Sequence, residues 1–142
     1  MAELSISKAR SIIRGIFKKS REMELKPLSV IVLDAGGNVK AFEREDGASP
    51  GRFEIAYGKA YGVVMTGMPG SALMKRAEEQ AYFVSALNGA FGGRVVPVPG
   101  GVLVRDARER ILGAVGVTGD TSDNDAEVAV EGITAVGLSG EA

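Results

Sequence analysis

Glycine-rich motifs at the ends of aliphatic segments constrain the fold of this chain more than any other feature. Four occur in a fixed order: LDAGGN at residues 33–38, EDGA at 45–48, VPGGV at 98–102 and GAVGVTGD at 113–120. Glycine beside a strand is unfavourable unless the backbone needs a positive φ or another group must approach closely. The motifs therefore predict where strands turn and where a neighbouring group or a ligand comes close to the backbone.

The size and composition of the chain indicate one folded domain spanning residues 1–142. A chain of 142 residues with 45% hydrophobic content can bury most of its apolar side chains in a single core. No apolar run approaches the roughly 20 residues that cross a membrane, and the first residues lack the pattern of a secretory signal. We therefore expect a cytoplasmic protein with no membrane partner.

The residue types that are missing exclude several classes of chemistry. The sequence has no cysteine and no histidine, which removes thiolate catalysis, cysteine zinc sites and the commonest general base. The formal net charge of −1 argues against nucleic acid as a partner. Basic residues nevertheless dominate positions 7–24 and acidic residues positions 119–142, so complementary contacts between subunits are expected.

Hydrophobic periodicity predicts an α+β domain. Helices are predicted at residues 9–23, 52–65, 71–88 and 124–136, the last capped by Asp123 or Asn124, and strands at 28–33, 39–44, 94–96, 102–105 and 111–117. This order, α-β-β-α-α-β-β-β-α, fits a mostly antiparallel five-stranded sheet with helices over its faces or edges. Gly58 and Gly62 lie inside the second helix, which predicts close packing against backbone or ligand.

One set of residues is a candidate site for an anion or a carboxylate. Arg44 and Asp46 follow the second predicted strand, Lys59 lies on the next helix, and the Pro99, Gly100 and Gly101 turn offers backbone N–H groups. Two cations beside such donors form an anion cradle. The alternative is structural ion pairing, with Arg44 bound to Asp46 or Glu54 and Lys59 bound to Asp34 or Glu54.

Two further clusters have both a functional and a structural interpretation. Asp120, Asp123 and Asp125 could hold a divalent cation, although helix capping explains them without a metal. A haem site would need an axial ligand, for which Tyr57, Tyr61, Met65 and Met68 are the candidates. The same four side chains could simply be core or surface residues.

The ordered motifs together resemble the GlcG/HbpS-like family over residues 5–138. The matches are V-x-D-x-G-G at 32–37, R-x-D-G-A at 44–48, K-A at 59–60, P-V-P-G-G at 97–101, G-A-V-G-V-T-G at 113–119 and D-x-x-x-A at 125–129. The resemblance implies a three-layer α/β/α architecture with a profilin-like antiparallel sheet that assembles into dimers or larger rings. It also implies an association with haem, with glycolate or diol metabolism, or with corrinoid enzymes.

The sequence departs from the family pattern next to Lys59. A threonine commonly follows Lys-Ala-x in the family, whereas here Tyr61 is followed by Gly62. We expect a homo-oligomer that binds a small molecule, either haem or another tetrapyrrole or a small carboxylate, through Arg44, Asp46, Lys59, Tyr61 and the turn at residues 99–101. The alternative is an enzyme or accessory subunit acting on a small hydroxy acid or related metabolite, with Lys59 or Asp46 as acid or base and Arg44 fixing a carboxylate.

Overall fold

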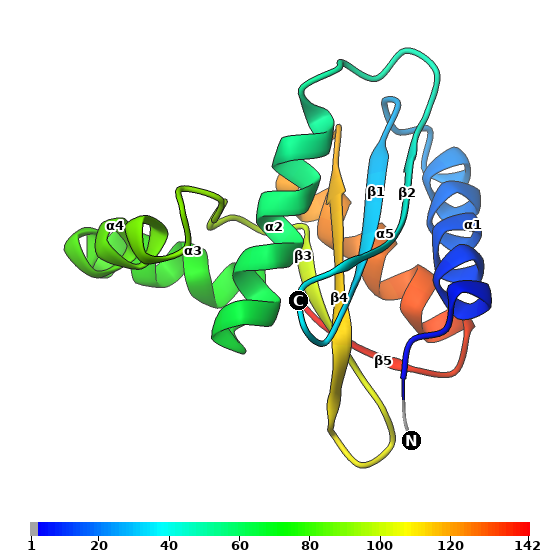
Figure 1. The fold of residues 1–142 in the computed structure, drawn as a ribbon. Coiled ribbons are helices and arrows are strands. Elements are labelled where there is room, and N and C mark those ends of the chain that lie inside the picture. The colour runs from blue at the N-terminus through cyan, green and yellow to red at the C-terminus, as the bar shows by residue number, and fades with distance from the viewer. Residues whose placement is uncertain (1–2) are drawn as a thin grey trace.

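The computed structural model describes residues 3–142 and shows a twisted antiparallel sheet between two layers of helices (Figure 1). The strands are β1 (Ser29–Asp34), β2 (Val39–Arg44), β3 (Gly101–Arg105), β4 (Ile111–Thr118) and β5 (Ser139–Glu141). The helices are α1 (Ile6–Glu22), α2 (Arg52–Thr66), α3 (Gly70–Glu79), α4 (Ala81–Ala90) and α5 (Ser122–Ala135). The sheet order is β2-β1-β4-β3-β5, and every pair is antiparallel. The predicted α+β fold with a five-stranded antiparallel sheet is confirmed.

Each face of the sheet has its own hydrophobic core. Helices α1 and α5 cover one face, where the side chains of Val30, Val32 and Val115 point. Helix α2 covers the other face, where Ile31, Leu33 and other alternate residues pack. This alternation along β1 explains its continuous aliphatic run, because a central strand covered on both faces has no side exposed to water.

The α3–α4 pair projects from the body as an arm (Figure 1). Helix α4 packs mainly on α3, and α3 makes few contacts with α2. Tyr82 is 74% exposed and Phe83 is 40% exposed, so the arm presents aromatic side chains to solvent. No helix within residues 3–142 is both long enough and apolar enough to cross a membrane.

The observed elements differ from the predicted ones in three places. The helix predicted at 71–88 is divided at Gln80, whose φ of −138° interrupts the helical backbone. Residues 94–96 are not a strand, and the fifth strand is instead Ser139–Glu141, paired with β3. Helix α5 begins two residues earlier than predicted, and its N-cap is Thr121 rather than Asp123 or Asn124, because the Thr121 hydroxyl accepts a hydrogen bond from the Asn124 N–H.

The segment at 94–96 explains the two glycines inside α2. The Val96 N–H donates to the Gly58 carbonyl at 3.1 Å, and a Cβ at Gly58 would lie 2.5 Å from the Arg94 carbonyl oxygen. A Cβ at Gly62 would lie 2.9 Å from the Val95 side chain. The predicted close packing at these glycines is confirmed, and the partner is this loop.

Candidate functional site

A buried ion pair connects the two helical layers beside the end of β4. The Lys59 ammonium, on α2, lies 3.2 Å from Asp125 Oδ2, on α5, and donates to the Val117 carbonyl at 3.0 Å. Lys59 is 3% exposed and Asp125 is 1% exposed. Burial lowers the pKa of Lys59 and raises the pKa of Asp125, because each charged form loses hydration. Lys59 therefore forms a structural ion pair, as the alternative interpretation of the sequence predicted. The predicted partners, Asp34 and Glu54, were wrong, because the partner is Asp125.

The turn at residues 99–101 closes over Lys59. Pro99, Gly100 and Gly101 are all buried, and Gly100 adopts a φ of +114° that favours glycine. A Cβ at Gly100 would lie 2.8 Å from the Lys59 nitrogen. The absence of a side chain at Gly100 thus leaves room for the Lys59 ammonium beside Asp125. This packing is a structural reason for the glycines of the turn, and the sequence alone did not reveal it.

Arg44 and Asp46 lie apart from this pair. The Arg44 guanidinium donates to the Ala48 carbonyl at 2.7 Å and forms no ion pair with Asp46 or Glu54 in the described part of the chain. Asp46 is exposed on the following loop. The predicted cradle of Arg44, Lys59 and the glycine turn stays a prediction, but each of its cations has a partner within the chain.

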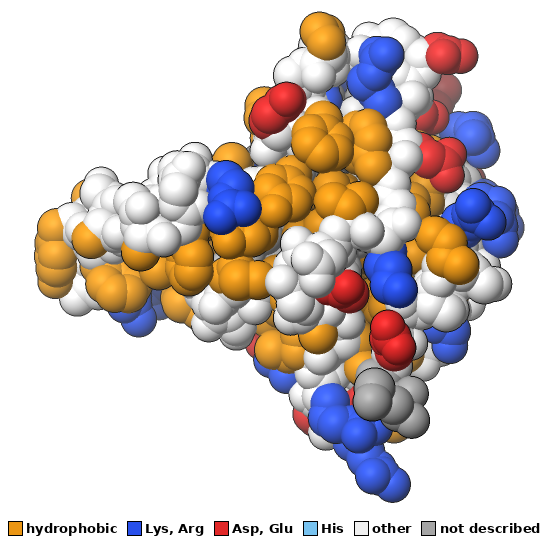
Figure 2. Space-filling view, viewed as in Figure 1, with side chains coloured by type: hydrophobic (Ala, Val, Ile, Leu, Met, Phe, Trp, Pro, Cys, Tyr) orange, Lys and Arg blue, Asp and Glu red, His pale blue; other side chains and the backbone are white. Residues whose placement is uncertain are grey.

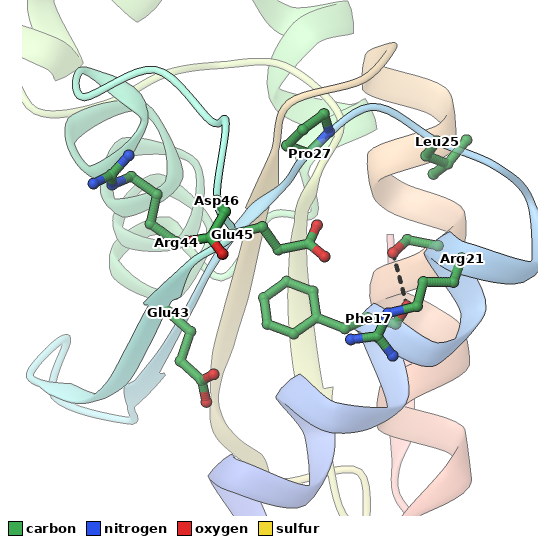
Figure 3. Close-up of a pocket in the computed structure, with 9 residues that line it drawn as sticks. Phe17, Arg21, Leu25, Pro27, Glu43, Arg44, Glu45 and Asp46 are labelled. Carbon is green, nitrogen blue, oxygen red and sulfur yellow. Dashed lines mark hydrogen bonds between the residues drawn. The ribbon is translucent and has the colours of Figure 1, made fainter.

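A groove of about 460 Å³ lies between α1 and the end of β2 (Figure 3). Phe17 and Arg21 line it from α1, and Glu43 and Glu45 line it from the other side. Figure 3 shows the Arg44 side chain pointing away from these residues, toward the ribbon of α2. Glu45 is already engaged, because its carboxylate accepts the Leu28 N–H at 2.8 Å.

Of the three aspartates near α5, Asp120 and Asp125 form a hydrogen-bond network, whereas Asp123 lies in the first turn of the helix. The Asp120 carboxylate accepts hydrogen bonds from the Asn124 side chain and from the backbone N–H groups of Lys26 and Thr121. These bonds lower the pKa of Asp120 to about 2. The remaining Asp125 oxygen accepts the Asp120 N–H at 3.0 Å. Asp120 and Asp125 therefore tie the start of α5 to the segment before β1 and to α2.

An aromatic surface lies on the outer side of α2, between the arm and β2 (Figure 2). It consists of rings that follow one another within 6.1 Å between centroids: Phe42, Phe53, Tyr57, Tyr61 and Phe91. The Arg94 guanidinium lies 4.3 Å from the centroid of Tyr61 and 3.5 Å from the Tyr57 hydroxyl. Aromatic residues four apart on α2 place the middle three rings on one face of that helix.

The aromatic surface meets two of the three requirements of a haem or related tetrapyrrole. Such a ligand needs an apolar wall, cations for its carboxylates and, for iron, an axial donor. Phe53 is 38% exposed and offers apolar surface, and Arg94 is an exposed cation at the edge. For the third requirement, the axial donor, the usual histidine and cysteine ligands are absent from the sequence, which leaves the phenol and thioether groups as candidates.

Comparison with known proteins identifies the family. The model of the family described as haem degrading protein HbpS-like matches residues 4–134. The chain belongs to this HbpS-like family. The resemblance inferred from the ordered glycine motifs is therefore confirmed. No curated protein sequence gave a significant match.

Solved structures of HbpS-like proteins share this fold. HbpS is 26% identical, with a TM-score of 0.82 over 96% of this chain and 92% of HbpS. A Streptomyces reticuli HbpS double mutant is 25% identical, with a TM-score of 0.80 over 96% of this chain and 88% of that protein. A haem complex of PduOC, 21% identical, reaches a TM-score of 0.86 over 99% of this chain and all of PduOC. The PduOC likeness shows the fold alone.

Sequence reasoning found Tyr57 and Tyr61 but missed the rest of the aromatic surface. Phe53, Tyr57 and Tyr61 recur every four residues, which is a local signal for a shared helix face. Phe42 comes from β2, and Phe91 and Arg94 come from the segment after α4. Their approach to α2 depends on tertiary packing, for which the sequence has no local signal.

Proposed function

We propose that this HbpS-like protein binds haem or a related flat tetrapyrrole that carries carboxylates, and that the aromatic surface is its binding site. The observation that supports the proposal is the continuous row of rings from Phe53 to Tyr61, with the Arg94 guanidinium over the Tyr61 ring at one end of the row. A planar macrocycle gains from burial against aromatic faces, and its carboxylates gain from a guanidinium. Family membership and the haem complex of the PduOC neighbour agree with this class of ligand.

The residues available for the iron predict a modest affinity. Histidine and thiolate ligands are excluded by composition, so an axial donor must be Tyr57, Tyr61, Met65 or Met68. Tyr61 is the first candidate by sequence, but its ring is 9% exposed and is packed between Tyr57, Phe91 and Arg94. Stacking and the Arg94 charge then carry more of the binding than coordination does.

A Soret titration of purified protein with haem tests the proposal. We expect a saturable complex, and we expect Arg94→Gln to weaken it by about tenfold or more, because a hydrogen bond to a charged group contributes about 1.5–3 kcal/mol. The exposed Arg10→Gln on α1 is the matched control and should bind as the wild type does. No saturable complex, or equal affinity in the Arg94 and Arg10 variants, would remove the proposal.

The Tyr61→Phe variant separates coordination from stacking. It keeps the ring against Tyr57 and Phe91 but removes the hydroxyl. A changed Soret maximum would identify the phenol as the iron ligand. An unchanged spectrum and affinity would reject Tyr61 in that role while leaving the stacking site in place.

We also propose that the α3–α4 arm is the contact through which copies of this chain form a dimer or larger ring. The arm buries little of its own surface, and its most exposed large side chain, Tyr82, lies beside Phe83. Tyrosine and phenylalanine are enriched in protein interfaces relative to the rest of the protein surface.

Light scattering after size exclusion tests this contact. We expect wild-type protein to be oligomeric and the Tyr82→Glu/Phe83→Glu double variant to be monomeric, because two carboxylates would have to be buried at the interface. Ile6→Glu is the control, since Ile6 is 44% exposed on α1, far along the chain from the arm. A monomeric wild type, or a double variant that stays oligomeric, would contradict the proposal.

The enzymatic alternative gains little from the geometry. A lowered Lys59 pKa suits a general base, and burial supplies that shift. The ammonium is nevertheless enclosed by Asp125, the Val117 carbonyl and the glycine turn, and Lys59 is 3% exposed. A substrate would have to displace the turn to reach it, so the binding function is the one we propose.

A further inference from the structure

A row of polar side chains crosses the sheet beneath the first turn of α2. Ser29 of β1 pairs across the sheet with Arg44 of β2 on one side and with Thr118 of β4 on the other. Residues directly opposite one another in antiparallel strands point to the same face. That face is the one under α2, because Ile31, two residues beyond Ser29, belongs to the core beneath α2.

Ser29 has a polar group without a partner. Its side chain is 0% exposed, and its hydroxyl is the one buried side-chain oxygen or nitrogen within residues 3–142 that forms no hydrogen bond. Leaving a buried hydroxyl unsatisfied costs about 1–3 kcal/mol, so such a group in a folded protein calls for an explanation.

Two arginines belong to this row on either side of Ser29, because Arg44 is its cross-strand partner on β2 and Arg52 reaches Thr118, its partner on β4. Arg52, in the first turn of α2, donates to the Thr118 hydroxyl at 2.8 Å, and Arg44 donates to the Ala48 carbonyl at 2.7 Å. Neither arginine forms an ion pair with a carboxylate in the described part of the chain. Arg44 is exposed and Arg52 is half-buried, so both remain open to a ligand from solvent.

The local electrostatics favour a negative charge at this place. The N-cap of α2 is Gly51, which offers no side chain to the first N–H groups of the helix. Those groups and the helix dipole attract anions. Burial is the main cause that lowers the pKa of Lys59, Asp125 opposes it, and the charge of Arg52 also lowers this pKa, so Arg52 lies close enough to Lys59 to interact with it electrostatically. Among the carboxylates of the neighbouring segments, Asp125 is paired with Lys59 and Glu45 accepts the Leu28 N–H, while Asp46 and Glu54 are exposed.

We infer that Arg44, Arg52 and the Ser29 hydroxyl form a binding site for the carboxylate group of a small organic acid. A carboxylate has two oxygens and can accept from both guanidiniums while also accepting from the serine hydroxyl. This site adjoins the Phe42 and Phe53 end of the aromatic surface but uses different side chains. Its second cation beside Arg44 is Arg52, in place of the buried Lys59. Because Ser29 has no exposed surface of its own, its hydroxyl is reached only if the side chains that cover it move aside, and such a movement admits only a small acid.

The Ser29→Ala variant gives a test in which stability and binding move in opposite directions. Removing an unsatisfied buried hydroxyl should leave the protein as stable as the wild type or more so. Acetate is the probe, titrated against isotope-labelled protein by NMR at constant ionic strength, with chloride as the balancing anion. We expect acetate to shift the amide signals of residues 29, 52 and 118, and we expect Ser29→Ala and Arg52→Gln each to weaken acetate binding at least tenfold.

Several results would overturn the inference. These are an absence of saturable shifts, equal acetate affinity in wild type and Ser29→Ala, or equal losses in the control variant Arg108→Gln, whose side chain is exposed on the turn before β4. Tighter binding of inorganic phosphate than of acetate would overturn the assignment to a carboxylate. Haem binding should be unchanged in Ser29→Ala, so failure of this site and failure of the aromatic surface are distinguishable.

Discussion

The Lys59→Met variant should lose about 3–5 kcal/mol of unfolding free energy, the cost of leaving one member of a buried ion pair without its partner. Methionine fills a similar volume, so the loss comes from the charge rather than from a cavity. Asp125 would remain 1% exposed with no cation beside it. The measurement is urea unfolding at pH 7, read from the midpoint at a constant slope.

A surface pair provides the control for this prediction. Lys40 lies 3.8 Å from Glu3, and both side chains are partly exposed, so Lys40→Met should cost less than about 1 kcal/mol. A loss as small as this in Lys59→Met would show that the Asp125 pair contributes nothing beyond a surface contact.

The same variant has a signed pH dependence. Without Lys59 the Asp125 carboxyl keeps the raised pKa that burial causes, and a carboxyl with a folded pKa above its unfolded pKa destabilises the fold as pH rises through that interval. The deficit of Lys59→Met should therefore shrink toward pH 4. The double variant Lys59→Met/Asp125→Asn should be more stable than Lys59→Met alone at pH 7, since the amide oxygen can still accept the Asp120 N–H. A deficit that does not change with pH would assign the loss to packing.

Hydrophobic periodicity correctly predicted the helices and strands whose apolar side chains face a core. It gave the wrong secondary structure where contacts with distant segments determine the backbone conformation. The β-branched residues at 94–96 suggested a strand, but the Val95 N–H donates to the Asn88 side chain and the Val96 N–H to the Gly58 carbonyl. Conversely, β5 is the short segment Ser139–Glu141, which has no strand pattern of its own and exists because β3 offers an edge.

The candidate site shows the same limit. Lys59 lies between Ala56 and Val63 on the buried face of α2, and a lysine in that position indicates a buried partner. Its partner Asp125 is 66 residues away on the opposite layer, so no spacing in the sequence could identify it. Ser29 was missed because it resembles an ordinary strand residue until β2 and β4 are placed beside it. Arg52 was missed because its contact with Thr118 depends on how α2 packs on the sheet.

The glycines of β4 carry the second prediction with a large effect, because they set how closely α2 approaches the sheet. Gly116 lies under α2, and a Cβ there would overlap the Ala56 carbonyl and lie 3.0 Å from the Ala60 Cβ. Backbone cannot yield as a flexible side chain can, so Gly116→Ala should push α2 outward and cost about 3 kcal/mol or more. Thermal and urea unfolding measure this loss.

Gly89→Ala is the matched control for Gly116→Ala. Gly89 lies within α4, and nothing approaches within 4 Å of an added Cβ. Alanine there should stabilise the helix by up to about 1 kcal/mol, because glycine loses more backbone entropy. Glycine to alanine is thus expected to lower the free energy of unfolding at position 116 and to raise it at position 89. The distance from the added Cβ to neighbouring backbone explains the difference. If Gly116→Ala were within about 1 kcal/mol of the wild type, the glycine motif of β4 would not be explained by the approach of α2. That motif would then need a ligand, rather than packing, as its reason.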